Sequence, residues 1–137
     1  MTKELWINLP VKDINTSKEF FTKLGFTFNE EYGNSDDSLS LVFGAKKVIV
    51  MLFKESVFEK FTRTKTADLS LGSEVLISID AESKEEVDEI CDRVEKAGGM
   101  IFGKPEEVQG WMYGCGFADP DGHRWNVLHM DFSKLKK

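Results

Sequence analysis

The segment Glu74–Gly99, EVLISIDAESKEEVDEICDRVEKAGG, decides the fold of this chain. Its first seven residues are an apolar run of the length typical of a strand. Ser83 is then followed three residues later by Glu86, a capping-box pattern that predicts the start of a helix. Apolar side chains recur at helical spacing up to Gly98, where a glycine pair predicts the helix end. We therefore expect a strand followed by an amphipathic helix.

Three further strands are expected after this helix. Residues 100–102 begin a strand that Pro105 is expected to terminate, because proline cannot donate to a sheet ladder. Residues 111–118 and 123–130 are apolar runs on either side of Asp119-Pro120-Asp121-Gly122, a strong turn signal. The predicted order is strand, helix and three strands (βαβββ).

The first half of the chain repeats this order. Residues 4–11 (ELWINLPV) predict a strand, Thr16-Ser17-Lys18-Glu19 a capping box, and Gly25 the end of the helix. Strands are then expected at 26–31, 38–43 and 47–53. Both helices are predicted to begin at Ser-Lys-Glu, at Ser17 and Ser83, so that the second is about two turns longer.

These patterns predict an α+β fold of two tandem βαβββ units whose mixed sheets curl around a cleft. The units span about 1–53 and 74–132 of a single domain, 1–137, joined by a linker, 54–73. Residues 56–61 (SVFEKF) have the spacing of a short amphipathic helix.

Composition excludes several classes of partner. A net charge of −6 and the lack of a basic cluster before the last residues argue against nucleic acid. No apolar run is long enough to span a bilayer, and no signal segment precedes the first strand. We expect a cytoplasmic protein in which Cys91 and Cys115 are reduced thiols packed as small hydrophobic groups.

Two motifs carry a family likeness. Asn8-Leu9-Pro10-Val11-Lys12-Asp13 before a helix, and the tail from Gly116 through Asp119-Pro120-Asp121-Gly122 to Val127, resemble the vicinal oxygen chelate superfamily. Glyoxalase I, bleomycin- and fosfomycin-resistance proteins and extradiol dioxygenases belong to it, and small bacterial glyoxalase-like proteins are the most similar kind. The likeness covers essentially the whole chain. It implies a cleft that is commonly completed in a homodimer.

The resemblance also implies where a metal would bind. Metal-using members carry one His or Glu ligand on the first and fourth strands of each unit. Those positions fall here on Trp6, on Val50 or Met51, on Glu74 and on Asn126. Indole, aliphatic and thioether groups are not ligands for a hard divalent ion, and one carboxylate with one amide does not hold it. We therefore expect no metal and no other cofactor.

The remaining polar and aromatic residues suggest a binding pocket. The pocket would have aromatic walls and only a few polar side chains, a composition that suits a flat or apolar small molecule. An equally weighted alternative is that the rings only fill the core. The candidate ligand-binding residues are Trp6, Asn8, Glu74, Trp111, Tyr113, Trp125 and Asn126.

Three functions are compatible with these residues. The first is a metal-independent protein that binds or sequesters a small apolar or aromatic molecule. The second is a glyoxalase-like lyase or a dioxygenase-like metalloenzyme with ligands not yet located. The third is a metal-free enzyme in which Glu74, with a pKa raised by an apolar cleft, acts as general base. A solvated Glu74 at a strand end is the favoured reading of that residue.

Other reactive side chains give weaker signals. His123 and His129 have no partners at ligand spacing and are expected at the surface or at sheet edges. Cys115 lies between Gly114 and Gly116, whose missing side chains allow another group to approach closely. No cation is adjacent that would lower the pKa of this thiol, so catalysis by it is not expected.

Overall fold

The computed structural model describes residues 1–135, and the chain divides into two compact units, residues 1–68 and residue 69 onward. The division falls inside the segment expected to be the linker. Each unit combines one sheet with helices, which confirms the α+β class. Among the described residues, no helix is both long and apolar enough to cross a membrane.

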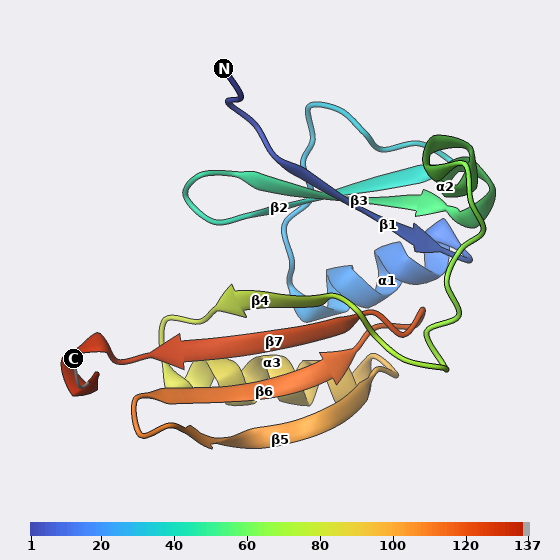
Figure 1. Ribbon diagram of the computed structural model, residues 1–137. Helices are drawn as coiled ribbons and strands as arrows, with labels where there is room; N and C mark the ends of the chain where they lie inside the picture. The colour runs from blue at the N-terminus through green and yellow to red at the C-terminus, as the bar shows by residue number, and fades with distance from the viewer. Residues whose placement is uncertain (136–137) are drawn as a thin grey trace. The chain divides into compact units, whose positions relative to one another are not determined.

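The first unit contains a three-stranded mixed sheet and two helices (Figure 1). The sheet has the order β1-β3-β2, with β1 parallel and β2 antiparallel to β3. The elements in chain order are β1 (Trp6–Val11), α1 (Ile14–Leu24), β2 (Ser38–Phe43), β3 (Val48–Lys54) and α2 (Glu55–Thr62).

The prediction of a strand at residues 26–31 is wrong. Only an isolated bridge between Phe28 and Leu41 forms there. The asparagine at position 29 accepts a hydrogen bond from the backbone N–H of Glu31 and donates to Ser40 Oγ at 3.3 Å. Such local side-chain bonds favour turns and compete with a sheet ladder, so the segment becomes a loop folded against β2.

The predicted start of the first helix is also wrong. Asp13, and not Thr16 or Ser17, is the N-cap, and its carboxylate accepts from the backbone N–H of Thr16 at 3.0 Å. Ser17 lies inside the helix on its buried face. The two long helices therefore contain 11 and 13 residues, a smaller difference than two turns. Gly25 ends α1 in the left-handed conformation, as predicted.

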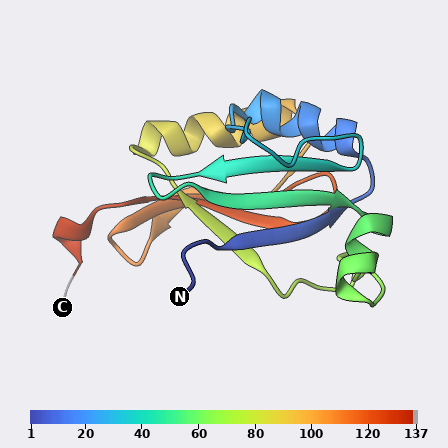
Figure 2. The ribbon, with the colours of Figure 1, turned by 90° about the horizontal axis from the view of Figure 1, so that it is seen from above.

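The core of the first unit lies between α1 and one face of the sheet (Figure 2). Phe20, Phe21 and Leu24 of α1 are buried at helical spacing. Leu39, Leu41, Val50 and Leu52 are buried strand residues of the sheet. Burying each such side chain stabilises the fold by about 1.5–3 kcal/mol. The sheet's other face has no long helix of this unit over it.

The second unit contains a four-stranded sheet of order β4-β7-β6-β5, covered by α3. Strands β4 and β7 are parallel, and β7-β6 and β6-β5 are antiparallel pairs. Its elements are β4 (Leu76–Asp80), α3 (Lys84–Lys96), β5 (Met100–Val108), β6 (Met112–Ala118), β7 (Arg124–Met130) and a 3-10 turn, η1 (Phe132–Lys134). Ser83 caps α3 and accepts from Glu86 N–H at 3.1 Å, as predicted.

Pro105 does not terminate β5, contrary to the sequence-based expectation. The strand continues to Val108, and its register with β6 shifts between Gly103 and Glu106. Because β5 is the edge of the sheet, the proline falls where no ladder hydrogen bond is required of it.

The predicted turn at residues 119–122 is held by a buried carboxylate. Asp119 accepts from the backbone N–H groups of Asp121 and His123, each at 3.0 Å, and from the indole N–H of Trp125 at 3.2 Å. Burial raises the pKa of Asp119, while His123 and these hydrogen bonds act in the opposite direction. The turn therefore ties β7 to the core of the unit.

The capping assignment gives the first prediction. Asp13→Ala removes the acceptor for Thr16 N–H, so the free energy of unfolding should fall by about 1 kcal/mol. Thr16→Ala is the control, because its exposed side chain is not the cap. Urea denaturation followed by circular dichroism measures both. An equal or larger loss in Thr16→Ala would show that the capping box suggested by sequence operates after all.

Candidate functional site

The open face of the first sheet carries two of the predicted site residues. Strand register places Trp6 in one row with Ile49 and Val42. Asn8 lies in the next row, with Met51 and Ser40. Trp6 and Asn8 are both exposed, whereas Ile7 between them points toward the helix-covered face.

Trp6 is held by a hydrogen bond rather than left mobile. Its indole N–H donates to the phenol oxygen of Tyr32 at 2.8 Å, although the two residues are 26 positions apart. The loop carrying Tyr32 is itself fixed, since Asn29 donates to the Tyr32 carbonyl at 3.3 Å. The indole is 48% exposed and Tyr32 is 49% exposed. Together they form a pre-arranged aromatic surface. No pattern in the sequence indicated that Tyr32 would be part of it.

Tyr32 lines a hollow of about 740 Å³, whereas Trp6 and Asn8 are not among the residues that line it. Val42 and Ile49, from the row that contains Trp6, form part of its floor, and Tyr32 contributes to its wall. A site of this size and mixed character is typical of small-molecule pockets. Its remaining lining residues are Glu4, Thr27, Phe28, Asn29, Glu30, Glu31, Gly44 and Lys47.

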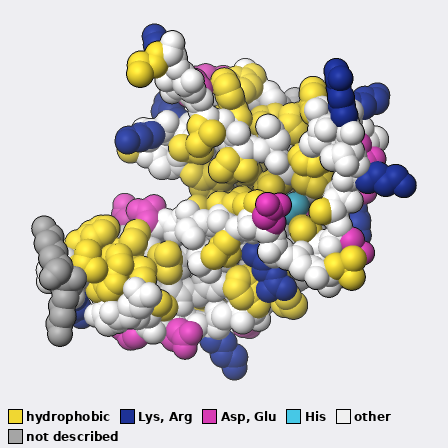
Figure 3. Space-filling model, viewed as in Figure 1, with side chains coloured by type: hydrophobic (Ala, Val, Ile, Leu, Met, Phe, Trp, Pro, Cys, Tyr) yellow, Lys and Arg dark blue, Asp and Glu magenta, His cyan; other side chains and the backbone are white. Residues whose placement is uncertain are grey.

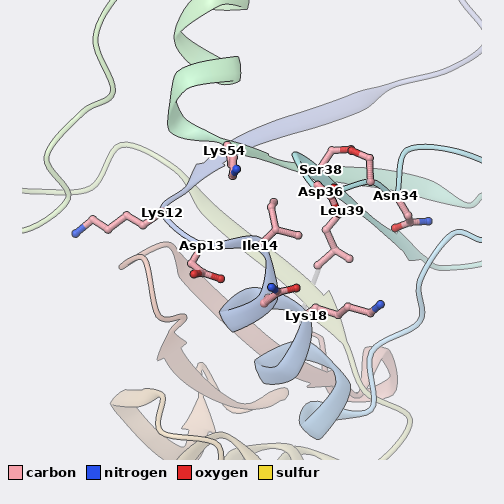
Figure 4. Close-up of a pocket in the computed structure, with 11 residues that line it drawn as sticks. Lys12, Asp13, Ile14, Lys18, Asn34, Asp36, Ser38, Leu39 and Lys54 are labelled. Carbon is pink, nitrogen blue, oxygen red and sulfur yellow. The ribbon is translucent and has the colours of Figure 1, made fainter.

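A second hollow of the first unit, of about 540 Å³, lies at the start of α1 (Figure 4). Three lysines line it, at positions 12, 18 and 54. Their ammonium groups point in different directions, and Lys54 is already paired with Asp37 at 3.3 Å. The helix N-terminus is occupied by its own cap, Asp13. The lysines therefore do not converge on one ligand atom.

In the second unit, Glu74 and Asn126 lie on or beside the open face of the sheet. Asn126 is half-buried and pairs across the ladders with Ser78 and Gly116. Glu74 precedes β4 and is exposed, which agrees with the solvated reading of this carboxylate. It lines a hollow of about 340 Å³ together with Phe102 and other residues from the same unit.

The glycines flanking Cys115 admit other side chains, as the sequence suggested. A Cβ at Gly116 would lie 2.4 Å from the ring of Phe102, and a Cβ at Gly114 would lie 2.5 Å from the Leu128 side chain. Cys115 itself is buried on the opposite face. Burial, and then the neighbouring Cys91, raise the pKa of its thiol to about 12, which disfavours the reactive thiolate.

The other three aromatic residues proposed for the pocket belong to the second unit. Trp125 is fully buried in the core, with its ring stacked on Phe117 at 6.1 Å. Tyr113 donates to Asp88 of α3 at 2.6 Å, and this bond raises the pKa of the phenol to about 12. Trp111 precedes β6 and its ring contacts that of Phe132. Trp125 therefore fills the core and does not line a pocket, because strand alternation places it on the opposite face from Asn126.

The two histidines lie in different surroundings, and neither belongs to a cluster of metal-ligating side chains within the described residues. His123 is buried next to the Asp119 carboxylate, and not at the surface as expected. His129 is half-buried, and its Nδ1 lies 3.2 Å from the carbonyl oxygen of Ala81. Within residues 1–135, no group of three or more His, Cys, Asp or Glu side chains is arranged to hold a metal ion.

Strand register settles which fourth-strand residue faces the open side. Val50 pairs with Ile7 and Leu41 on the helix side, whereas Met51 shares the row of Asn8. The positions named by the resemblance thus offer an indole, a thioether, a carboxylate and an amide. This set does not fit a divalent metal, which in catalytic sites takes about three nitrogen, oxygen or thiolate protein ligands.

The chain belongs to the Glyoxalase/Bleomycin resistance protein/Dioxygenase superfamily, whose family model matches residues 5–127. This confirms the relationship suggested by the two motifs. A search among curated proteins gives no match.

Solved structures agree with this assignment. The hypothetical protein SA1046 from S. aureus is 32% identical, with a TM-score of 0.82 over 94% of this chain and 95% of that chain. A family enzyme from Burkholderia phytofirmans is 20% identical (TM-score 0.75, coverage 91% and 96%). The fosfomycin resistance protein FosX from Listeria monocytogenes is 22% identical (TM-score 0.67, coverage 98% and 98%). The last two establish the fold alone.

The glycines of β6 give the second prediction. In Gly114→Ala the new Cβ would lie 2.9 Å from the backbone oxygen of Val127, which cannot rotate away. We expect a loss of about 1–3 kcal/mol in the free energy of unfolding. Gly103→Ala is the matched control: its Cβ would lie 3.5 Å from the backbone nitrogen of Gly116, an ordinary contact, and stability should change little. Equal stability of the two variants in urea titrations would contradict this account of the packing.

Proposed function

We propose that this protein binds or sequesters a small apolar or aromatic molecule, and that it does so without a metal ion. The observation that carries the proposal is the hydrogen bond between Trp6 and Tyr32, which joins two half-exposed rings. Of the two, Tyr32 also lines a hollow of about 740 Å³. An indole held in place loses little conformational entropy when a flat ligand stacks on it. Asn8, exposed on the same face, supplies a polar group that orients the ligand.

The degenerate metal site is part of the proposal. Glu74 and Asn126, which the resemblance places at ligand positions, lie in the second unit, and Trp6 and Met51 lie in the first. The donor chemistry of these four residues supports binding rather than metal-dependent lyase or dioxygenase chemistry. We also keep the homodimer implied by the family, for which light scattering should give twice the chain mass of 15.6 kDa.

Saturation-transfer NMR with indole as the probe tests the aromatic site. Indole should receive saturation from the wild-type protein, and Trp6→Ala should weaken its binding by about three- to tenfold, because the stacking surface is lost. Tyr32→Phe keeps the ring but removes the acceptor of the indole N–H, so we expect a weakening of about two- to fivefold.

Phe132→Ala is the control for this experiment. It also removes a well-exposed ring, but from the 3-10 turn of the second unit. Binding of indole to this variant should match the wild type. If Trp6→Ala and Phe132→Ala bind indole as well as the wild type does, the Trp6 surface is not the site.

A further inference from the structure

A separate feature of the second unit is a guanidinium stacked on an aromatic ring. The Cζ atom of Arg124, at the start of β7, lies 4.5 Å from the centroid of the Phe102 ring. The ring in turn lies directly over Gly116, where any Cβ would collide with it. Sheet, ring and guanidinium form three layers, so the ring supports the guanidinium from one side.

This guanidinium is charged but has no acidic partner in the described structure. The ion pairs formed within residues 1–135 involve other cations, and none of them includes Arg124. Glu74 lines the same hollow without forming an ion pair with Arg124. A stacked arginine keeps the N–H donors at the edge of its plane available, in a geometry that matches two oxygen atoms of an acid.

The hollow around Arg124 has apolar side chains as well as Glu74 and two serines, Ser70 and Ser73. Phe102 is 43% exposed, and Leu71, Val75 and Leu76 expose half or more of their side chains. These residues line the hollow of about 340 Å³ with Arg124, a volume at the lower end of the range for small-molecule sites. Apolar patches also reach the surface elsewhere on the face shown in Figure 3. At Arg124, however, the patch surrounds a cation that an aromatic ring supports from one side.

We propose that this hollow binds the oxyanion group of a small organic acid whose apolar body rests against Phe102 and Leu76. The acid is held by two parallel N–H···O bonds from Arg124, and its body removes exposed apolar surface from water. The site goes beyond the function proposed above, because all of its residues belong to the second unit and none belongs to the Trp6 surface.

Titration of the full chain with benzoate tests the proposal, with binding followed in ¹H–¹⁵N spectra at low ionic strength. Benzamide, the uncharged analogue, should bind about tenfold more weakly, because a charge-assisted bidentate contact is replaced by neutral ones. Phenylphosphonate, compared with benzoate, distinguishes a tetrahedral from a planar oxyanion. Benzoate affinity should also fall as salt is added.

Two variants locate the site. Arg124→Gln should weaken benzoate binding about tenfold and benzamide binding much less, because benzoate alone loses a bidentate contact between opposite charges. Phe102→Leu keeps an apolar side chain but removes the ring beneath the guanidinium, so benzoate should bind about threefold more weakly.

Arg93→Gln is the matched control. It removes the same charge from the same unit, at a surface arginine of α3 paired with Glu89. Benzoate affinity should not change in this variant, and thermal unfolding should show that all three variants are folded. The proposal is overturned if benzoate does not bind, if benzoate and benzamide bind equally, or if Arg93→Gln weakens binding as much as Arg124→Gln does. None of these outcomes bears on the Trp6 site, which is read with indole.

Discussion

Each sheet of this protein has two faces and one long helix to cover them. In the first unit α1 buries Phe20, Phe21 and Leu24 against one side of the sheet, and in the second unit α3 does the same with Val87, Cys91 and Val94. Strand alternation then dictates which residues remain on the opposite faces. Trp6 and Asn8 are placed there by the same periodicity that sends Leu9 and Val11 into the core. The candidate binding surfaces are therefore a consequence of how the core is built.

On each open face a large side chain of a candidate binding surface is held by a neighbouring group. In the first unit a side-chain hydrogen bond joins Trp6 to Tyr32 across 26 residues. In the second unit glycine at position 116 lets the Phe102 ring lie against the sheet and support Arg124. Both arrangements hold a large side chain in one orientation, which lowers the entropic cost of binding. The first surface is aromatic with an uncharged polar neighbour, and the second presents a cation, so they suit different ligand chemistry.

Much of the fold follows from short-range signals in the sequence. The alternation of strand residues, the cap at Ser83, the stop at Gly25 and the turn after Ala118 are local patterns, and the structure agrees with them. The errors arise where two local signals compete. Asp13 and Thr16 are both good caps, and it is the hydrogen bond from Thr16 N–H to Asp13, together with the burial of Ser17, that shows the helix beginning earlier. Likewise, Pro105 is tolerated because β5 is an edge strand, a fact of topology that no local pattern contains.

The site was less predictable, because it depends on contacts between distant residues. Trp6, Asn8 and Asn126 are candidates that strand positions alone suggest, whereas Tyr32 comes from a loop and Phe102 lies at a register shift of β5. Under the function proposed above, this member of the superfamily binds its ligand without a metal ion. Metal analysis of the purified protein after mild dialysis tests it directly. We expect no stoichiometric nickel, zinc, manganese or iron, and one equivalent of any of them would rule out the metal-free function.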